Sequence, residues 1–540
     1  MTNPLHILRN SAGLALELHA GHGAAQRLLS GPDDAPLMLN LFPGNALEGG
    51  PANLWLRRRD DANGDWQATP LLGPRSPLAI LAAEADALTL GGEWQGLTVR
   101  LQWRLAAGAA AWFWHVELRS AAACQTSLML AQDVGLASPQ TVAINEFYVS
   151  QYIDWQPLEH PQHGWLLAAR QNQAQGGLNP WLMIGSLGRA ASFGTDALQF
   201  FGHALHEDQP PPALAQGLPG KRLQHEHAFA LLEDAAQDLT PGASWRGGFF
   251  AALLPHHEAA SNPNDLAVAT GTLALPEATG ARLPAAESAA PIVAGPLAAL
   301  PMLPTRELDD AAITAAFGPD RLHAEHDAAG RLISFFQPGA RHVVLRAKEL
   351  AVARPHGHVL RAGEHLTPDE RALTSTCWMG GVFHSMLTQG HVKLGRMLST
   401  QRGMLGFYRS QGLRAWIGSA QHGWQLLGLP SAFEIEPQGC RWLYAHALGL
   451  LEVRSTAGPE PERMGLALRV LEGPPLAITL TFDARCDDDD AGPGLPLQPL
   501  ACPGGWRLAA LAGSSLGRRL PGAALRLELP TPAEAVDLQG

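Results

Sequence analysis

The chain has 540 residues, of which 46% are hydrophobic and 16% charged, and its formal net charge is -12. Disordered and fibrous proteins carry fewer apolar residues and more charge, so this composition excludes both classes and predicts a large buried core. Binding of nucleic acid needs concentrated positive charge, and three lysines with scattered arginines do not provide it.

The N-terminus and the cysteines predict a cytoplasmic protein. Residues Met1–Ser11 contain no apolar stretch of signal-peptide length, and no run of about 18 apolar residues could span a bilayer. We therefore expect no membrane partner. The cysteines are odd in number and widely spaced, which indicates reduced thiols: Cys124, Cys377, Cys440, Cys486 and Cys502.

Alternation of apolar and polar residues dominates the first half of the chain. It is clearest in Leu97–Leu105 and Trp112–Arg119, which a short Gly-containing connection joins as a hairpin. Long helical periodicity is nearly absent, so residues 1–257 are predicted to form a first antiparallel β-sandwich with one wetted face per strand. Further strands are predicted at 14–18, 53–58, 147–153, 165–170, 181–186, 224–232 and 245–253.

An Ala- and Pro-rich stretch, 258–304, separates this region from the next, and 261–275 within it is predicted to be a short helix. Residues 305–540 are predicted to form a second, mostly β sandwich, incomplete at its C-terminal end. A capping box at Thr367–Glu370 predicts a short helix. The acidic run Asp487–Asp490 is predicted to be a solvated loop. Strands are predicted at 332–336, 342–350, 412–417, 424–429, 441–446, 450–455, 465–471, 477–483 and 523–529.

Known catalytic and metal motifs are weak in this sequence. Gly513–Gly517 matches the nucleophile-elbow pattern, but Pro521-Gly522 would break the helix that such an elbow requires. Histidine pairs such as His225 with His227 lack the further ligands of a zinc site. We therefore predict no metal, no cofactor and no catalytic residue from these motifs.

The richest polar and aromatic stretch is Asn145–Trp155, and a second follows at Trp378 and His384. Sugar-binding surfaces pair aromatic faces with amides and carboxylates, whereas large β-sandwiches also bury such aromatic residues as core. Both interpretations stay open. If the first stretch is extended, Glu146, Tyr148, Tyr152 and Asp154 share one face. The candidate sugar-binding residues are Asn145, Glu146, Tyr148, Gln151, Tyr152, Asp154, Trp155, Trp378 and His384.

Four segments carry a family resemblance: INEFYVSQYIDW (144–155), LPGKRLQHEH (218–227), TSTCWMGGVFHSMLTQGH (374–391) and PSAFEIEPQGCRWLY (430–444). They resemble the N-terminal, non-barrel half of 1,2-β-oligoglucan phosphorylases and cellobiose-phosphorylase-like proteins of glycoside hydrolase family 94. They are also similar to regions of cyclic β-1,2-glucan synthases.

This resemblance implies galactose-mutarotase-like supersandwiches placed ahead of an (α/α)6 barrel that carries the chemistry. In such enzymes one aspartic acid protonates the glycosidic oxygen while phosphate attacks the anomeric carbon with inversion. The family's barrel motif has its nearest match at Gly64-Asp65-Trp66, but Gln67 follows and a hairpin turn precedes. A strand-rich chain of this length leaves no room for the barrel, so no catalytic role is transferred to Asp65.

The sequence therefore predicts the carbohydrate-binding region of a β-1,2-glucan-processing glycoside phosphorylase, a glycosyltransferase-type enzyme, without its catalytic barrel. The expected partners are a β-glucan oligosaccharide and either a separate (α/α)6 barrel or a second copy of the chain. The alternative is a stand-alone mutarotase-like or lyase-like enzyme. Its acid-base candidates are Glu146, Asp154, His225, Glu226 and His227.

Overall fold

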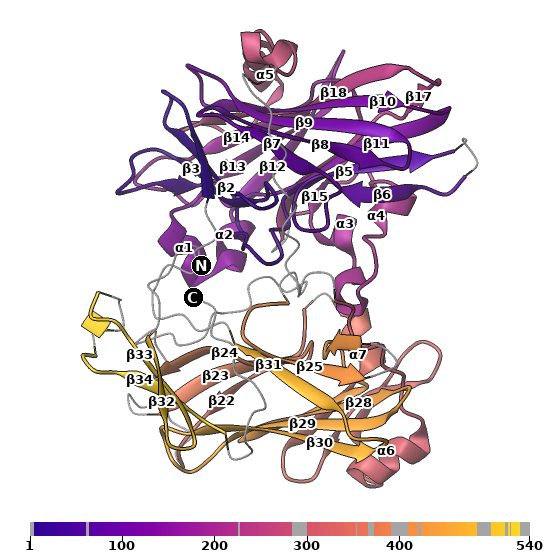
Figure 1. Ribbon diagram of the computed structural model, residues 1–540, viewed down its shortest axis with the longest axis vertical. Helices are drawn as coiled ribbons and strands as arrows, with labels where there is room; N and C mark the ends of the chain where they lie inside the picture. The colour runs from indigo at the N-terminus through magenta and orange to yellow at the C-terminus, as the bar shows by residue number, and fades with distance from the viewer. Residues whose placement is uncertain are drawn as a thin grey trace. The chain divides into compact units, whose positions relative to one another are not determined.

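The computed structural model divides the chain into two compact units, in both of which strands predominate (Figure 1). The first unit comprises Thr2–Gly202 and Pro210–Ala299, and the second comprises His203–Gln209 and Leu300–Gly540. The structure describes residues 5–60, 64–224, 227–282, 284, 300–352, 354–364, 372–389, 409–419, 423–482, 498–513, 517–518 and 520–529.

The first unit contains a four-stranded sheet and a fourteen-stranded sheet. The small sheet consists of β1 (Leu5–Arg9), β2 (Leu14–His19), β3 (Ala25–Ser30) and β4 (Leu37–Met38). The main path of the large sheet runs through β6 (Gln67–Pro70), β5 (Asn53–Arg59), β11 (Cys124–Asp133), β16 (Ala228–Asp234), β15 (Ala190–Asp196), β13 (Gly164–Gln171), β14 (Trp181–Ser186), β18 (Ser244–Leu254), β10 (Ala111–Ser120), β9 (Leu97–Leu105), β8 (Ala87–Trp94) and β7 (Ala79–Ala83). Beside this path, β12 (Ile153–His160) pairs with β13, and β17 (Gln237–Leu239) pairs with β11.

The core of the first unit follows from the alternation in β9 and β10. Leu97, Val99, Leu101, Trp103 and Leu105 are all buried on one face of β9, as predicted. The expectation of one wetted face per strand is wrong for β10, because Phe113 and His115 on its other face are buried as well. Helix α5 (Leu266–Leu273) and the turn that follows it cover that face, and His115 Nε2 lies 2.8 Å from the Glu277 carbonyl oxygen.

The helices of the first unit are short. They are α1 (Pro139–Ile144), α2 (Glu146–Gln151), α3 (Leu198–Phe201), α4 (Ala213–Gln216) and α5, with 3-10 turns at Pro263–Asp265 and Pro276–Thr279. The predicted helix at 261–275 is confirmed by α5 and by the 3-10 turn Pro263–Asp265 before it, which has a capping box formed by Asn262 and Asp265. The predicted strand at 224–232 begins later, at Ala228.

The predicted strand at 147–153 is wrong, because this segment is helix α2 followed by the start of β12. Asn145 provides the reason: its side-chain oxygen accepts a hydrogen bond from the Tyr148 backbone N–H at 3.0 Å and caps the helix. Ser138 does the same for α1, through the Thr141 N–H at 3.1 Å. These caps outweigh the strand preference of Phe, Tyr and Val in this segment.

The second unit is a sandwich of two sheets with a smaller third sheet. The seven-stranded sheet consists of β19 (Leu322–His326), β20 (Leu332–Gln337), β21 (Arg341–Leu345), β27 (Ala432–Glu436), β28 (Gly439–His446), β29 (Gly449–Ala457) and β30 (Met464–Glu472). The six-stranded sheet consists of β22 (Gly357–Arg361), β23 (Leu373–Trp378), β24 (Val382–Gln389), β25 (Leu413–Ser419), β26 (Gly423–Leu426) and β31 (Ala477–Phe482). The third consists of β32 (Gln498–Cys502), β33 (Gly505–Ala509) and β34 (Ala524–Glu528).

Trp442 lies at the centre of the core between these sheets. Its ring centroid is 4.9 Å from that of Phe383 and 5.0 Å from that of Phe433, and its indole N–H donates to the Trp378 carbonyl oxygen at 3.1 Å. The helices of this unit are α6 (Asp310–Phe317) and α7 (Arg346–Ala351), with a 3-10 turn at Ala204–Glu207. The predicted strand at 342–350 therefore ends at Leu345, where α7 begins.

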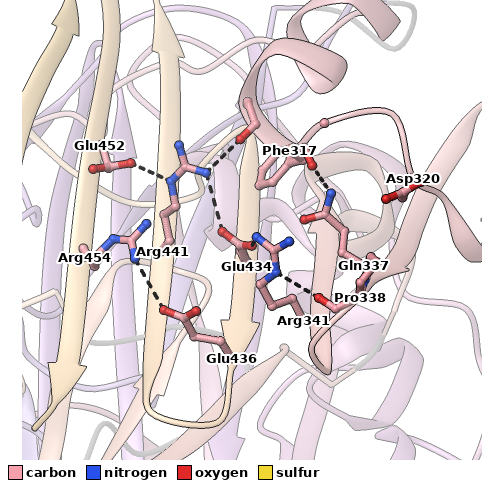
Figure 2. A network of polar contacts seen from close by, with 12 residues as sticks. Phe317, Asp320, Gln337, Pro338, Arg341, Glu434, Glu436, Arg441, Glu452 and Arg454 are labelled. Carbon is pink, nitrogen blue, oxygen red and sulfur yellow. Dashed lines mark hydrogen bonds and ion pairs between the residues drawn. The ribbon is translucent and has the colours of Figure 1, made fainter.

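The other face of the seven-stranded sheet carries the charged network in Figure 2. Arg441 binds Glu452 at 2.6 Å, lies 3.5 Å from Glu434 and donates to the Ala316 carbonyl oxygen at 3.1 Å. Arg341 also pairs with Glu434, and Arg454 pairs with Glu436, both at 3.4 Å. The arginines and glutamates of this network balance in charge, so we interpret it as a lattice that joins neighbouring strands.

The described part of the chain contains helices of three to eight residues and no ring of paired helices. None of the helices in that part is long and apolar enough to cross a lipid bilayer. The mainly β fold predicted from the sequence is confirmed. The predicted capping box at Thr367–Glu370 and the acidic loop Asp487–Asp490 lie outside the described residues.

Candidate functional site

Helix α2 and its two capping residues present four of the nine candidate sugar-binding side chains on the surface of the first unit. Asn145, Tyr148 and Gln151 are exposed, and Tyr152 is half-buried. Tyr148 and Tyr152 are one helical turn apart, so their rings meet edge to face with centroids 5.0 Å apart and hydroxyls 2.9 Å apart. Tyr148 keeps 46% of its surface exposed, so the pair offers an aromatic surface to a ligand.

The opposite side of helix α2 is fixed to the large sheet. Val149 and Ser150 are buried, and the Ser150 hydroxyl accepts a hydrogen bond from the Ala228 backbone N–H at 2.5 Å. The side-chain amide of the fully buried Gln171 donates to the carbonyl oxygens of Val149 at 3.2 Å and Gly135 at 3.0 Å. Strands β16 and β13 thereby hold the helix from below, which orders the exposed face before any ligand arrives.

Two of the segments that carry the family resemblance meet at this site. The Phe147 ring lies edge to face with the His227 ring, with centroids 6.0 Å apart. Arg222 donates to the Trp155 carbonyl oxygen at 3.0 Å. His227 Nδ1 is 4.0 Å from Asp196 Oδ2, and both side chains are buried. The acid-base candidates His225 and Glu226 lie outside the described residues.

Burial divides the predicted residues of this stretch into two groups. Trp155 is 2% exposed and belongs to the hydrophobic core, so its ring offers no face to a ligand, and Glu146 is also buried at 7%. The assignment of Glu146, Tyr148, Tyr152 and Asp154 to one extended face is wrong, because α2 is helical. Asp154 is half-buried at the start of β12.

Trp378 and His384 belong to the second unit. Trp378 is the last residue of β23 and is half-buried, whereas His384 on β24 is only 6% exposed. The His384 Nδ1 atom is 3.1 Å from the Ser375 hydroxyl, and burial lowers the pKa of His384 to about 4. His384 is therefore a neutral, enclosed side chain at neutral pH.

The described histidines and acids form no metal site, since no group of three or more His, Cys, Asp or Glu side chains in that part of the chain is placed to hold a metal ion. His256 Nδ1 accepts a hydrogen bond from the Asn179 N–H at 3.0 Å, and His257 binds Asp265 at 2.9 Å. These contacts give both histidines local structural partners.

Sequence reasoning missed Asp133, which fixes the loop that follows β4. Its side chain is fully buried, and Oδ2 accepts the backbone N–H groups of Leu41 at 2.6 Å and Phe42 at 2.5 Å. Burial raises the pKa of Asp133 to about 6, while these two bonds oppose the shift. Gln171 was missed as well. The local sequence gives no signal for either residue, because their partners are distant along the chain.

Two family models match parts of the chain. Residues 24–251 match the family model of the SOGP N-terminal domain, and residues 318–476 match that of the glycoside phosphorylase supersandwich domain. Over 371 residues, 68% of this chain, it is 27% identical to a 1,2-beta-oligoglucan phosphorylase from Listeria innocua serovar 6a. The chain spans 33% of the length of that relative.

Two solved structures are similar to about half of the chain. A galactose mutarotase-like protein from Lactobacillus casei is 10% identical with a TM-score of 0.26, covering 46% of this chain and 100% of that one. A galactose mutarotase related enzyme from Lactobacillus acidophilus is 8% identical with a TM-score of 0.26, covering 48% of this chain and 100% of that one. The two family models and the curated relative together relate this chain to the N-terminal region of glycoside phosphorylases.

Proposed function

We propose that this chain is the carbohydrate-binding region of a β-1,2-glucan-processing glycoside phosphorylase, and that helix α2 carries its sugar-binding surface. The proposal depends on the Tyr148–Tyr152 pair, in which Tyr148 is exposed and Tyr152 half-buried, together with the neighbouring amides of Asn145 and Gln151. The similarity to a 1,2-beta-oligoglucan phosphorylase suggests the β-1,2 linkage.

The chemistry of this surface suits a glucan chain. Aromatic rings cover the apolar C–H patches of a pyranose, and amide and carboxylate groups bind its hydroxyls. The Tyr148–Tyr152 pair provides the rings, and Asn145 and Gln151 provide the amides. Because α2 is anchored to β13 and β16, little ordering entropy opposes binding.

Phosphorolysis itself is assigned to a catalytic (α/α)6 barrel, joined to this region or separate from it. An inverting phosphorylase needs an acid at the glycosidic oxygen and a bound phosphate at the anomeric carbon. We propose that this chain alone binds oligosaccharide without releasing glucose 1-phosphate. The mutarotase-like alternative requires two titratable groups facing one sugar ring, and burial of Glu146 and His227 makes it the less favoured proposal.

Calorimetric titration with β-1,2-gluco-oligosaccharides tests the proposed surface. We expect weak binding by the unmodified chain and at least a tenfold loss of affinity when Tyr148→Ala and Tyr152→Ala are combined, about 1.4 kcal/mol or more. The matched control is Leu178→Ala, since Leu178 is 45% exposed on the same unit. Unchanged affinity in the tyrosine variant, or no heat with the unmodified chain, would contradict the proposal.

A further inference from the structure

A group of aromatic and titratable side chains lies in the second unit where β20 and β21 meet helix α7 and the loop that leads to β22. Phe336 and His342 are cross-strand partners, and their rings stack at 4.3 Å with an interplanar angle of 8°. Phe336 remains 40% exposed. A large aromatic residue that is stacked on one neighbour and still open to solvent provides a preorganised apolar surface.

Beside this pair, Glu349 holds His356 in a fixed orientation. The Glu349 side chain is 1% exposed, and its Oε2 atom is 2.6 Å from His356 Nδ1 and 3.0 Å from the His356 backbone nitrogen. The His356 carbonyl oxygen accepts a hydrogen bond from the Met379 N–H at 2.9 Å. The contact at Nδ1 leaves Nε2 as the ring atom that can bind another group, and 20% of the side chain is exposed.

The two histidines of this group are close enough to act on one ligand. The ring centroids of His342 and His356 are 6.4 Å apart at an interplanar angle of 69°. Burial, with His356 as a further cause, lowers the pKa of His342, so this ring stays neutral at neutral pH. A neutral imidazole has one N–H donor and one acceptor nitrogen, which suits a hydroxyl group that also both donates and accepts.

The charges around the group argue against an ionic ligand. The Lys348 ammonium is paired with Glu325, and the Glu349 carboxylate is engaged by His356. A bound anion would have to compete with Glu325 for Lys348. A metal ion would need three or more ligands, and the described residues place no such group together. An uncharged ligand fits these charges, and hydroxyl groups suit the neutral His342 imidazole.

One of the sequence-predicted sugar-binding residues lies next to this group. Trp378 pairs with Gly357, the residue that follows His356, and a Cβ atom at Gly357 would come within 2.5 Å of the Trp378 ring. The glycine thereby lets the half-buried indole lie flat against the start of β22. Trp378 therefore lies beside the residue that follows His356 in the pairing of β22 with β23.

We propose that Phe336, His342 and His356 form a second carbohydrate-binding site, in which the Phe336 ring covers one face of a sugar and the imidazoles bind its hydroxyls. This site goes beyond the proposed role of helix α2, because it is in the other unit and uses none of the same residues. Glu349 acts as a positioning residue that fixes the His356 ring.

The test uses the full chain with Tyr148→Ala and Tyr152→Ala, so that the α2 surface is removed, and β-1,2-glucotetraose as the probe. The ε1 resonances of 13C-labelled histidines are followed by NMR, with His342→Gln and His356→Gln variants to assign them. We expect the sugar to shift both resonances, and we expect Phe336→Ala to weaken the apparent affinity at least fivefold. Trp424→Ala, at a residue 39% exposed in the same unit, should leave the affinity unchanged.

Two results would overturn the second site. One is that neither histidine resonance moves with the sugar, in a variant whose thermal unfolding matches that of the parent chain. The other is that inorganic phosphate shifts these resonances while the sugar does not, which would make the group an anion site. Both results are independent of the calorimetric effect of the tyrosines, so failure here is distinguishable from failure of the α2 proposal.

Discussion

Replacing Arg57 with alanine is expected to lower the free energy of unfolding of the first unit by about 3–5 kcal/mol. Arg57 is 2% exposed on β5, where its guanidinium forms an ion pair with Glu233 and donates to the Ser127 hydroxyl at 3.0 Å. Its charge also lies 4.5 Å from the centroid of the Trp66 ring. The substitution leaves the Glu233 carboxylate, only 16% exposed, without its cation.

Glu233 also accepts the Leu218 backbone N–H at 2.8 Å. Leu218 begins the segment whose Arg222 contacts Trp155, so we expect Arg57→Ala to loosen this segment beside helix α2 as well. Urea denaturation at neutral pH measures the change. Arg9→Ala is the matched control, since Arg9 pairs with Asp33 while both side chains are more than half exposed, and we expect a change of about 0.5 kcal/mol or less. If both variants lost a similar amount of unfolding free energy, the buried Arg57–Glu233 pair would not be the reason for the large effect.

Asp234→Asn is expected to stabilise the protein at neutral pH. Asp234 is 4% exposed at the end of β16, and burial raises its pKa to about 8, with Glu233 adding to the shift and the Ser186 hydroxyl opposing it. Folding therefore forces this carboxyl to take up a proton at pH 7 that it does not carry when unfolded. Asparagine has nearly the same shape and no such proton to bind.

The sign of the pH dependence follows from the raised pKa. Below the unfolded pKa of 3.8, Asp234 is protonated in both states and does not lower the free energy of unfolding. As the pH rises from 3.8 toward 8, protonating the buried carboxyl costs more, and the free energy of unfolding falls. The variant and the parent chain should thus have similar stability near pH 4 and differ by about 4 kcal/mol at pH 7. Urea denaturation at several pH values checks this. A difference that is constant with pH would contradict the buried-carboxyl explanation.

The sequence predicted strands well where burial alone determines the pattern. Leu97–Leu105 has the predicted bounds because every second residue faces one packed core, and Trp181–Ser186 has them because all of its residues are buried. Segment 147–153 was predicted wrongly because the decisive contacts are not periodic. The Asn145 cap is local, but the bond from Ala228 to Ser150 joins residues 78 positions apart.

The candidate site could be predicted only in part from the sequence. Composition was enough to select Asn145–Trp155, but helix α2 decides which side chains are available: it brings Tyr148 and Tyr152 together and buries Glu146. The Glu349–His356 contact was not predicted, because Glu349 was placed in the predicted strand 342–350, whereas it lies in helix α7. Packing of α7 brings the Glu349 side chain, which is only 1% exposed, to His356.

Hydrogen–deuterium exchange of the full chain, with and without β-1,2-gluco-oligosaccharides, tests sugar binding at α2 most directly. Backbone N–H groups of α2 and its cap, Asn145–Gln151, should exchange more slowly with sugar present, while those of β9 in the distant core should not change. The Tyr148→Ala, Tyr152→Ala variant should lose the slowing at α2. Unchanged exchange in α2 at saturating sugar would contradict the account, as would slowing at α2 that survives in the tyrosine variant.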